Sequence, residues 1–75
     1  SLFRGVLTMT IQWTKLRSGL WHGVQRDQVV AIVERSREPS HRHRPYRLTI
    51  WHLGLAASCR TADEARAAAD LELSQ

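Results

Sequence analysis

The segment 61–73, TADEARAAADLEL, is the one stretch of the chain that clearly predicts a helix, and the fold class follows from what precedes it. Thr61 can cap the start of this helix, and Glu64, three residues later, completes a capping box. At about 100° per residue, the apolar side chains on one stripe are Ala62, Ala65, Ala69 and Leu73. Small side chains in this stripe predict a helix whose axis comes close to whatever it covers.

The residues before this helix alternate in the way that β-strands do. From Leu7 to Lys15, one face carries Leu7, Met9, Ile11 and Trp13. Further strands are predicted over residues 20–25, 29–33, 46–52 and 55–59, and Gly23 is a candidate bulge. Turns are predicted at 17–19 and 26–28, a loop with two prolines at 36–45, and a reversal at Gly54.

Four or five short strands followed by one helix predict an α+β domain. We expect an antiparallel meander sheet of three to five strands packed on one C-terminal α-helix. The 75 residues predict one small domain over 1–75, with residues 1–8 as a candidate extension, 36–45 as a basic loop and 61–73 as the helix. No apolar run approaches the ~20 residues of a membrane helix, and one cysteine cannot form an internal disulfide, so we expect a cytoplasmic protein.

Charge is distributed unevenly along the chain. Residues 1–60 carry ten basic and three acidic side chains, a net charge of +7, whereas residues 61–75 carry one basic and four acidic side chains, a net charge of −3. A basic body of this kind predicts a polyanionic partner on one side of the molecule. A bias toward arginine with solvated surface charges is the alternative interpretation.

The densest group of basic residues lies in and beside the loop at 36–45. It comprises Arg35, Arg37, Arg42, Arg44 and Arg47, with His41 and His43 between them and one acid, Glu38. Guanidinium groups bind phosphate in a bidentate manner, so these arginines are candidate nucleic-acid ligands. Trp21, Tyr46 and Trp51 are candidate stacking surfaces, although core packing is the better default for each of them. A solvated loop with no ligand is the alternative.

The sequence contains few motifs for catalysis or metal binding. The chain has no nucleophile elbow and no glycine-rich phosphate loop, and Cys59 has no histidine placed beside it by sequence, so we expect no enzyme activity, no cofactor and no small-molecule substrate. His41 and His43 could bind zinc together, but the pair-plus-pair spacing of zinc sites is missing. We therefore expect no metal site, with zinc as a third hypothesis.

Residues 61–70, TADEARAAAD, resemble the helix of plant ethylene-response-factor DNA-binding domains, whose relatives include the arm-type domains of phage tyrosine recombinases. The matching residues are Thr61, Ala62, Glu64, Ala65, Ala68 and Asp70. That family binds DNA with arginines and tryptophans of a sheet, so the resemblance implies contacts at Arg26, Arg35, Arg47 and Trp51. The chain departs from the family at Cys59, where the family has an aromatic residue. The overall layout also resembles small uncharacterised proteins of actinobacteria and their phages, which implies no activity.

Two functions therefore compete. The leading hypothesis is a small nucleic-acid-binding module that uses the arginine loop and the sheet face. The alternative is a protein-interaction module, a homodimer or the partner of a host protein, in which an open sheet face or an edge strand pairs with another chain. The alternative predicts an exposed apolar patch that contains one of the tryptophans.

Overall fold

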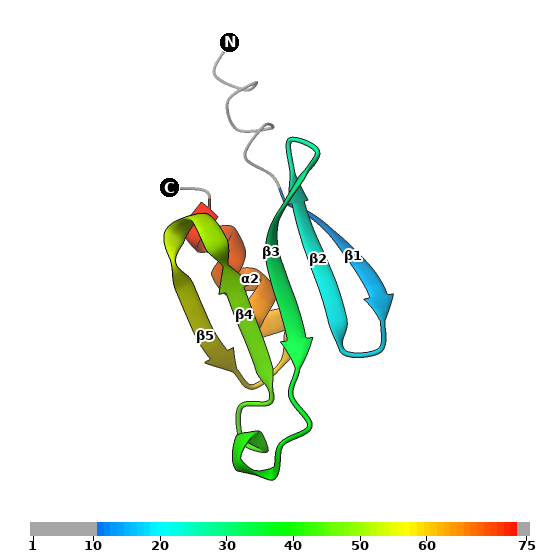
Figure 1. The fold of residues 1–75 in the computed structure, drawn as a ribbon, viewed down its shortest axis with the longest axis vertical. Helices are drawn as coiled ribbons and strands as arrows, with labels where there is room; N and C mark the ends of the chain where they lie inside the picture. The colour runs from blue at the N-terminus through cyan, green and yellow to red at the C-terminus, as the bar shows by residue number, and fades with distance from the viewer. Residues whose placement is uncertain (1–10, 74–75) are drawn as a thin grey trace.

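The computed structural model describes residues 11–73 of the chain. Within them, five strands form one antiparallel sheet in the order β1-β2-β3-β4-β5, and the helix α2 follows (Figure 1). The elements are β1 (Gln12–Arg17), β2 (Leu20–Gln25), β3 (Gln28–Arg35), β4 (Tyr46–Ile50), β5 (Leu55–Cys59) and α2 (Ala62–Leu73), with the short 3₁₀ helices η1 (Pro39–His41) and η2 (Trp51–Leu53). This arrangement confirms the α+β meander that the sequence predicts.

Consecutive strands run in opposite directions, so their connections alternate between the two ends of the sheet. The β1–β2 turn and the β3–β4 loop lie at one end, which we call the loop end (Figure 1). The β2–β3 turn and η2 lie at the other, which we call the far end. α2 begins at the loop end, directly after β5, and runs back along the sheet (Figure 1).

The core lies between the sheet and α2. Val33, Leu48 and Ile50 are fully buried there, and burial of each side chain is worth about 1.5–3 kcal/mol. Ala65 and Ala69 of α2 are also fully buried, which confirms the predicted stripe. Because their methyl groups are small, α2 lies close to the sheet, where it packs mainly on β3, β4 and β5.

The start of α2 has the predicted cap. The amide of Glu64 donates a hydrogen bond to Thr61 Oγ1 at 3.0 Å, and Asp63 forms an ion pair with Arg66 one turn along the helix. Both acids lie in the first turn, where carboxylates favourably oppose the positive end of the helix dipole. Across residues 11–73, no helix has the length and apolar character needed to span a membrane.

Gly23 is required by the close approach of a tryptophan. A Cβ atom at this position would lie 2.9 Å from both Cζ3 and Cη2 of Trp13 on the neighbouring strand. The β2–β3 register also shifts between Gly23 and Val24, which confirms the predicted irregularity. The indole of Trp13 therefore occupies the space that a side chain at residue 23 would need.

Several predicted boundaries were wrong. β1 continues to Arg17, beyond the predicted end at Lys15, and the predicted strand residues 7–10 lie outside the described part of the chain. The strand predicted over 46–52 ends at Ile50, because the chain leaves the sheet through η2 to reverse direction. Gly54 closes this reversal in the left-handed conformation, with φ at 61°.

Candidate functional site

The β3–β4 loop is ordered by hydrogen bonds within itself. The amide of Ser36 donates to the carbonyl of Pro45 at 2.6 Å and closes the base of the loop. The Ser36 hydroxyl lies 2.7 Å from His41 Nδ1 and accepts a hydrogen bond from the amide of Glu38 at 3.3 Å. Pro39 begins η1, and the fixed φ of proline suits the first position of such a turn. The loop therefore presents its side chains from a defined backbone.

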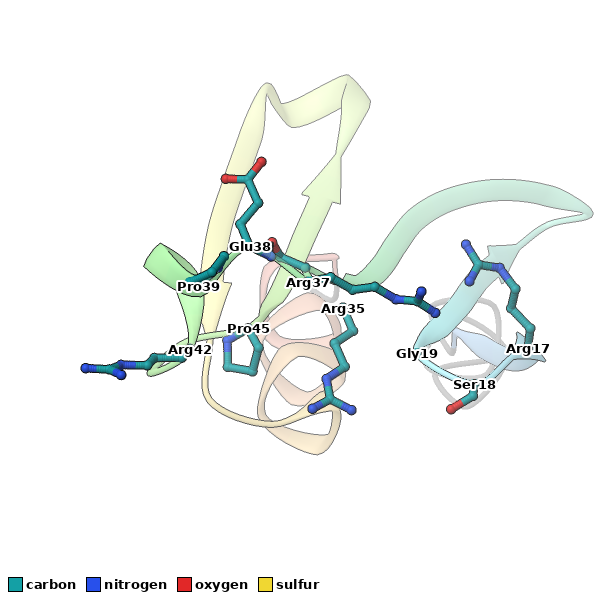
Figure 2. A pocket seen from close by; sticks show the side chains of 10 residues that line it. Arg17, Ser18, Gly19, Arg35, Arg37, Glu38, Pro39, Arg42 and Pro45 are labelled. Atoms are coloured by element: carbon teal, nitrogen blue, oxygen red, sulfur yellow. Dashed lines mark hydrogen bonds between the residues drawn. The ribbon is translucent and has the colours of Figure 1, made fainter.

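A first recess lies between this loop and the β1–β2 turn. It has a volume of about 470 Å³, and we call it the turn-side recess. Four arginines line it: Arg17, Arg35, Arg37 and Arg42. Figure 2 shows Arg37 reaching from the loop toward the turn that carries Arg17, while Arg42 extends from the loop on the other side. Residues far apart in the sequence thus line one concave surface, with the Arg42 guanidinium directed away from those of Arg17, Arg35 and Arg37 (Figure 2).

Gly19 joins the turn to β3 at this recess. The amide of Arg35 donates a hydrogen bond to the Gly19 carbonyl at 2.8 Å. Gly19 has a φ of +80°, and a Cβ atom there would lie 3.0 Å from the Cβ of Arg35. Glycine is thus favoured both by the left-handed backbone and by the close approach of Arg35.

A second recess of about 170 Å³ lies on the other side of the loop, toward β4 and β5. We call it the strand-side recess. Its walls include Arg44 and Arg47, together with Glu34, His41 and Ser58. Because Glu34 and Arg35 are consecutive in β3, their side chains leave opposite faces of the sheet. Arg47 is the register partner of Glu34 and shares its face, opposite Arg35. The two recesses lie on these two flanks of the loop, share Ser36, Glu38 and Pro45 as walls, and are joined by the Arg17–Glu34 ion pair.

The charge of the two recesses is strongly positive. Six arginines line them, against the two carboxylates Glu34 and Glu38. In the described part of the chain, the one ion pair formed by any of these arginines is Arg17–Glu34, at 3.9 Å with both side chains more than half exposed. A pair of this kind contributes little and leaves Arg17 available to a ligand. We call these six residues the arginine cluster: Arg17, Arg35, Arg37, Arg42, Arg44 and Arg47.

Five of the seven predicted site residues belong to this cluster, and two do not. Arg26 forms the β2–β3 turn at the far end of the sheet, with a φ of 54°. Trp51 lies in η2, also at the far end. The predicted grouping of Arg26 and Trp51 with the loop arginines is therefore not found, because the antiparallel order directs their connections away from the loop (Figure 1).

Sequence reasoning missed Arg17, which it assigned only to a turn. The signal that could have found it is the topology itself. In an antiparallel meander, the first and third connections meet at the same end of the sheet, so a basic residue at the β1–β2 turn must lie near the β3–β4 loop.

The candidate stacking aromatics are largely unavailable at the loop end. Trp21 packs on the core, and the Arg66 guanidinium lies 4.0 Å from its ring centroid, with Lys15 Nζ at 5.6 Å. These cation–π contacts cover its ring. Tyr46 begins β4 directly after the loop but is half-buried against the core. The loop end therefore offers a ligand charged side chains rather than exposed aromatic rings.

Cys59 lies buried where β5 ends, beneath the loop end. Burial raises the pKa of its thiol, the carboxylate of Glu64 raises it further, and the nearby charge of Arg44 acts in the opposite direction. The thiol is therefore protonated near neutral pH, unlike an activated nucleophile. Among the described residues, no group of three or more His, Cys, Asp or Glu side chains could hold a metal ion.

Comparison of the chain with protein-family models, with curated proteins and with solved structures found no match. The resemblance of residues 61–70 to the ethylene-response-factor helix therefore stays a prediction, and the case for function depends on the arginine cluster.

Proposed function

We propose that this protein binds nucleic acid through the arginine cluster and has no catalytic role. The observation that carries the proposal is the gathering of six arginines around one ordered loop, three from the loop itself and one each from β1, β3 and β4. Guanidinium groups on a concave surface suit phosphate oxygens, because each can donate two parallel hydrogen bonds. The buried, unpaired Cys59 is compatible with a reducing cytoplasm as the place of action.

The charge of the cluster sets the expected salt dependence. Each phosphate neutralised contributes about −0.9 to the slope of log K against log salt on duplex DNA. If all six arginines contact phosphates, the slope is about −5, and affinity falls roughly a thousandfold between about 50 and 200 mM salt.

A titration against fluorescent DNA and RNA at these two salt concentrations tests the proposal. The matched pair of variants, each of which removes one positive charge, is Arg37→Ala in the cluster and Arg26→Asn at the far end. Asparagine suits the positive φ of residue 26, so the control removes charge without disturbing the turn. We expect the cluster variant to bind more weakly with a shallower slope, and the control to bind like the unmodified protein. Absence of binding at low salt, or binding without a salt slope, would contradict the proposal.

A second candidate function is self-association through the far end. Trp51 is 54% exposed and Leu53 is 47% exposed, so η2 exposes two large apolar side chains, one of them a tryptophan, which supports this hypothesis. Large aromatic and aliphatic side chains of this kind are typical anchors of protein interfaces. Sedimentation analysis distinguishes the two candidates: a dimer that Trp51→Ser converts to a monomer supports self-association, and a monomer at all accessible concentrations contradicts it.

A further inference from the structure

The arginines of the cluster lie on both flanks of the β3–β4 loop. Arg35 and Arg37 line the turn-side recess, whereas Arg44 and Arg47 line the strand-side recess. A surface that follows a single phosphate backbone needs its basic groups along one path. A double helix has two backbones separated by a groove, and a projection between them meets phosphates on either side.

The loop has the form of such a projection. It extends β3 and β4 beyond the sheet end, as Figure 1 shows for the segment between these two strands. Neighbouring strands lie about 5 Å apart, and the major groove of B-form DNA, about 12 Å wide, admits a two-stranded ribbon. The hydrogen bonds of Ser36 to Pro45, His41 and Glu38 hold the loop in one conformation, which reduces the ordering cost of insertion.

We infer that the β3–β4 loop enters the major groove of double-stranded DNA, with the two recesses facing phosphates of opposite strands. Arg42 follows η1 near the tip of the loop, where its guanidinium can reach base edges, and guanine O6 and N7 are the acceptors that arginine suits best. A-form RNA has a deep, narrow major groove that side chains cannot enter, so duplex RNA is a poorer partner. This inference rests on the proposed function and specifies its ligand.

The first test compares probes. Binding of the full chain is measured at low salt to a DNA duplex of about 20 base pairs, to each separate strand, and to duplex RNA of the same sequence. We expect the single strands and the RNA duplex to bind at least about tenfold more weakly than the DNA duplex. Equal binding to single-stranded and duplex DNA would overturn groove insertion but leave nucleic-acid binding intact. Failure to bind any probe would overturn both.

The second test compares the two flanks. Arg37→Ala removes a charge from the turn-side recess, and Arg47→Ala removes one from the strand-side recess. Insertion predicts that each variant lowers duplex affinity about three- to tenfold and makes the salt slope shallower by about one, whereas Arg26→Asn changes neither. If only one of the two variants weakens binding, the loop contacts a single backbone and the inference is wrong.

The third test removes hydrogen bonds that hold the β3–β4 loop in one conformation and leaves the charge of the protein unchanged. Ser36→Ala removes the hydroxyl that contacts His41 and the amide of Glu38. We expect a several-fold loss of duplex affinity with an unchanged salt slope, because the phosphate contacts are conserved while the loop must be ordered on binding. Unchanged affinity in a variant that has lost the Ser36–His41 contact would show that loop order is irrelevant, and would count against insertion.

Discussion

Substitution of Gly19 by alanine should destabilise the fold in two ways, through backbone strain and through a close contact with Arg35. Gly19 has a φ of +80°, and its Cβ position lies 3.0 Å from the Cβ of Arg35. Gly54 offers a matched control, because it has a φ of +61° and no atom within 4 Å of its Cβ position. Gly54→Ala therefore measures the backbone cost alone, and Gly19→Ala measures that cost plus the contact with Arg35.

The expected magnitudes follow from this geometry. An alanine in left-handed backbone destabilises the folded state by about 1–2 kcal/mol. The same substitution lowers the entropy of the unfolded chain, which stabilises the folded state by about 0.4–1 kcal/mol. Gly54→Ala should therefore lower the free energy of unfolding by roughly 1 kcal/mol. The Cβ of Arg35 is fixed to the backbone of β3 and cannot rotate away. Overpacking of this kind costs about 1–3 kcal/mol more, so Gly19→Ala should have the larger effect.

Thermal unfolding followed by circular dichroism checks the difference. In a domain of this size 1 kcal/mol corresponds to about 4–8 °C, so the Tm of Gly19→Ala should lie at least about 4 °C below that of Gly54→Ala. DNA affinity, measured well below both transitions, should fall for Gly19→Ala and not for Gly54→Ala, since Gly19 lines the turn-side recess. Equal Tm values for the two variants would refute the claim that the turn packs tightly on β3.

Three further changes test other features. Gly23→Ala should lower the free energy of unfolding by about 1–3 kcal/mol in urea titrations, because the new methyl group meets the indole of Trp13. Adding Trp13→Leu to this variant should recover part of the loss, whereas an unchanged free energy of unfolding in Gly23→Ala would contradict this packing. Arg26→Gly should raise the free energy of unfolding by roughly 1 kcal/mol, since it relieves about 1–2 kcal/mol of left-handed strain and loses about 0.4–1 kcal/mol to the greater entropy of the unfolded chain, and a lowered Tm would contradict strain at this turn. Because the folded-state pKa of the Cys59 thiol is raised above 9.0, stability should be unaffected by this group below pH 9 and fall above it, as the unfolded chain releases the proton first; the same fall in Cys59→Ala would assign it to another group.

Much of the fold could be predicted because its determinants are local. The strands at residues 20–25 and 55–59 and the capped helix from residue 62 agree with the sequence predictions. Alternation, turn residues and a capping box are all properties of short segments. The end of β4 was misplaced because alternation continues through Trp51 and His52, while the chain has to leave the sheet to reverse.

The site was predictable only where it is continuous in sequence. The loop arginines are neighbours along the chain, so their grouping requires no knowledge of the fold. Arg17 joins them only through the order of the strands, and the same order carries Arg26 and Trp51 to the far end. The two-sided arrangement of the recesses depends on which face each side chain leaves, which is determined by strand register.

The hairpin of β1 and β2 supplies one wall of the turn-side recess, while α2 packs mainly on the other three strands. Five of the six side chains of β1 are exposed, so little apolar surface holds this strand in place. Segments of this kind open locally at lower free energy than a core, and their amide hydrogens exchange sooner. A ligand that bridges Arg17 and the loop would fasten the hairpin to the rest of the sheet. The free protein would then unfold in two steps, the β1–β2 hairpin first and the rest of the domain second, whereas the ligand-bound protein would unfold in a single step.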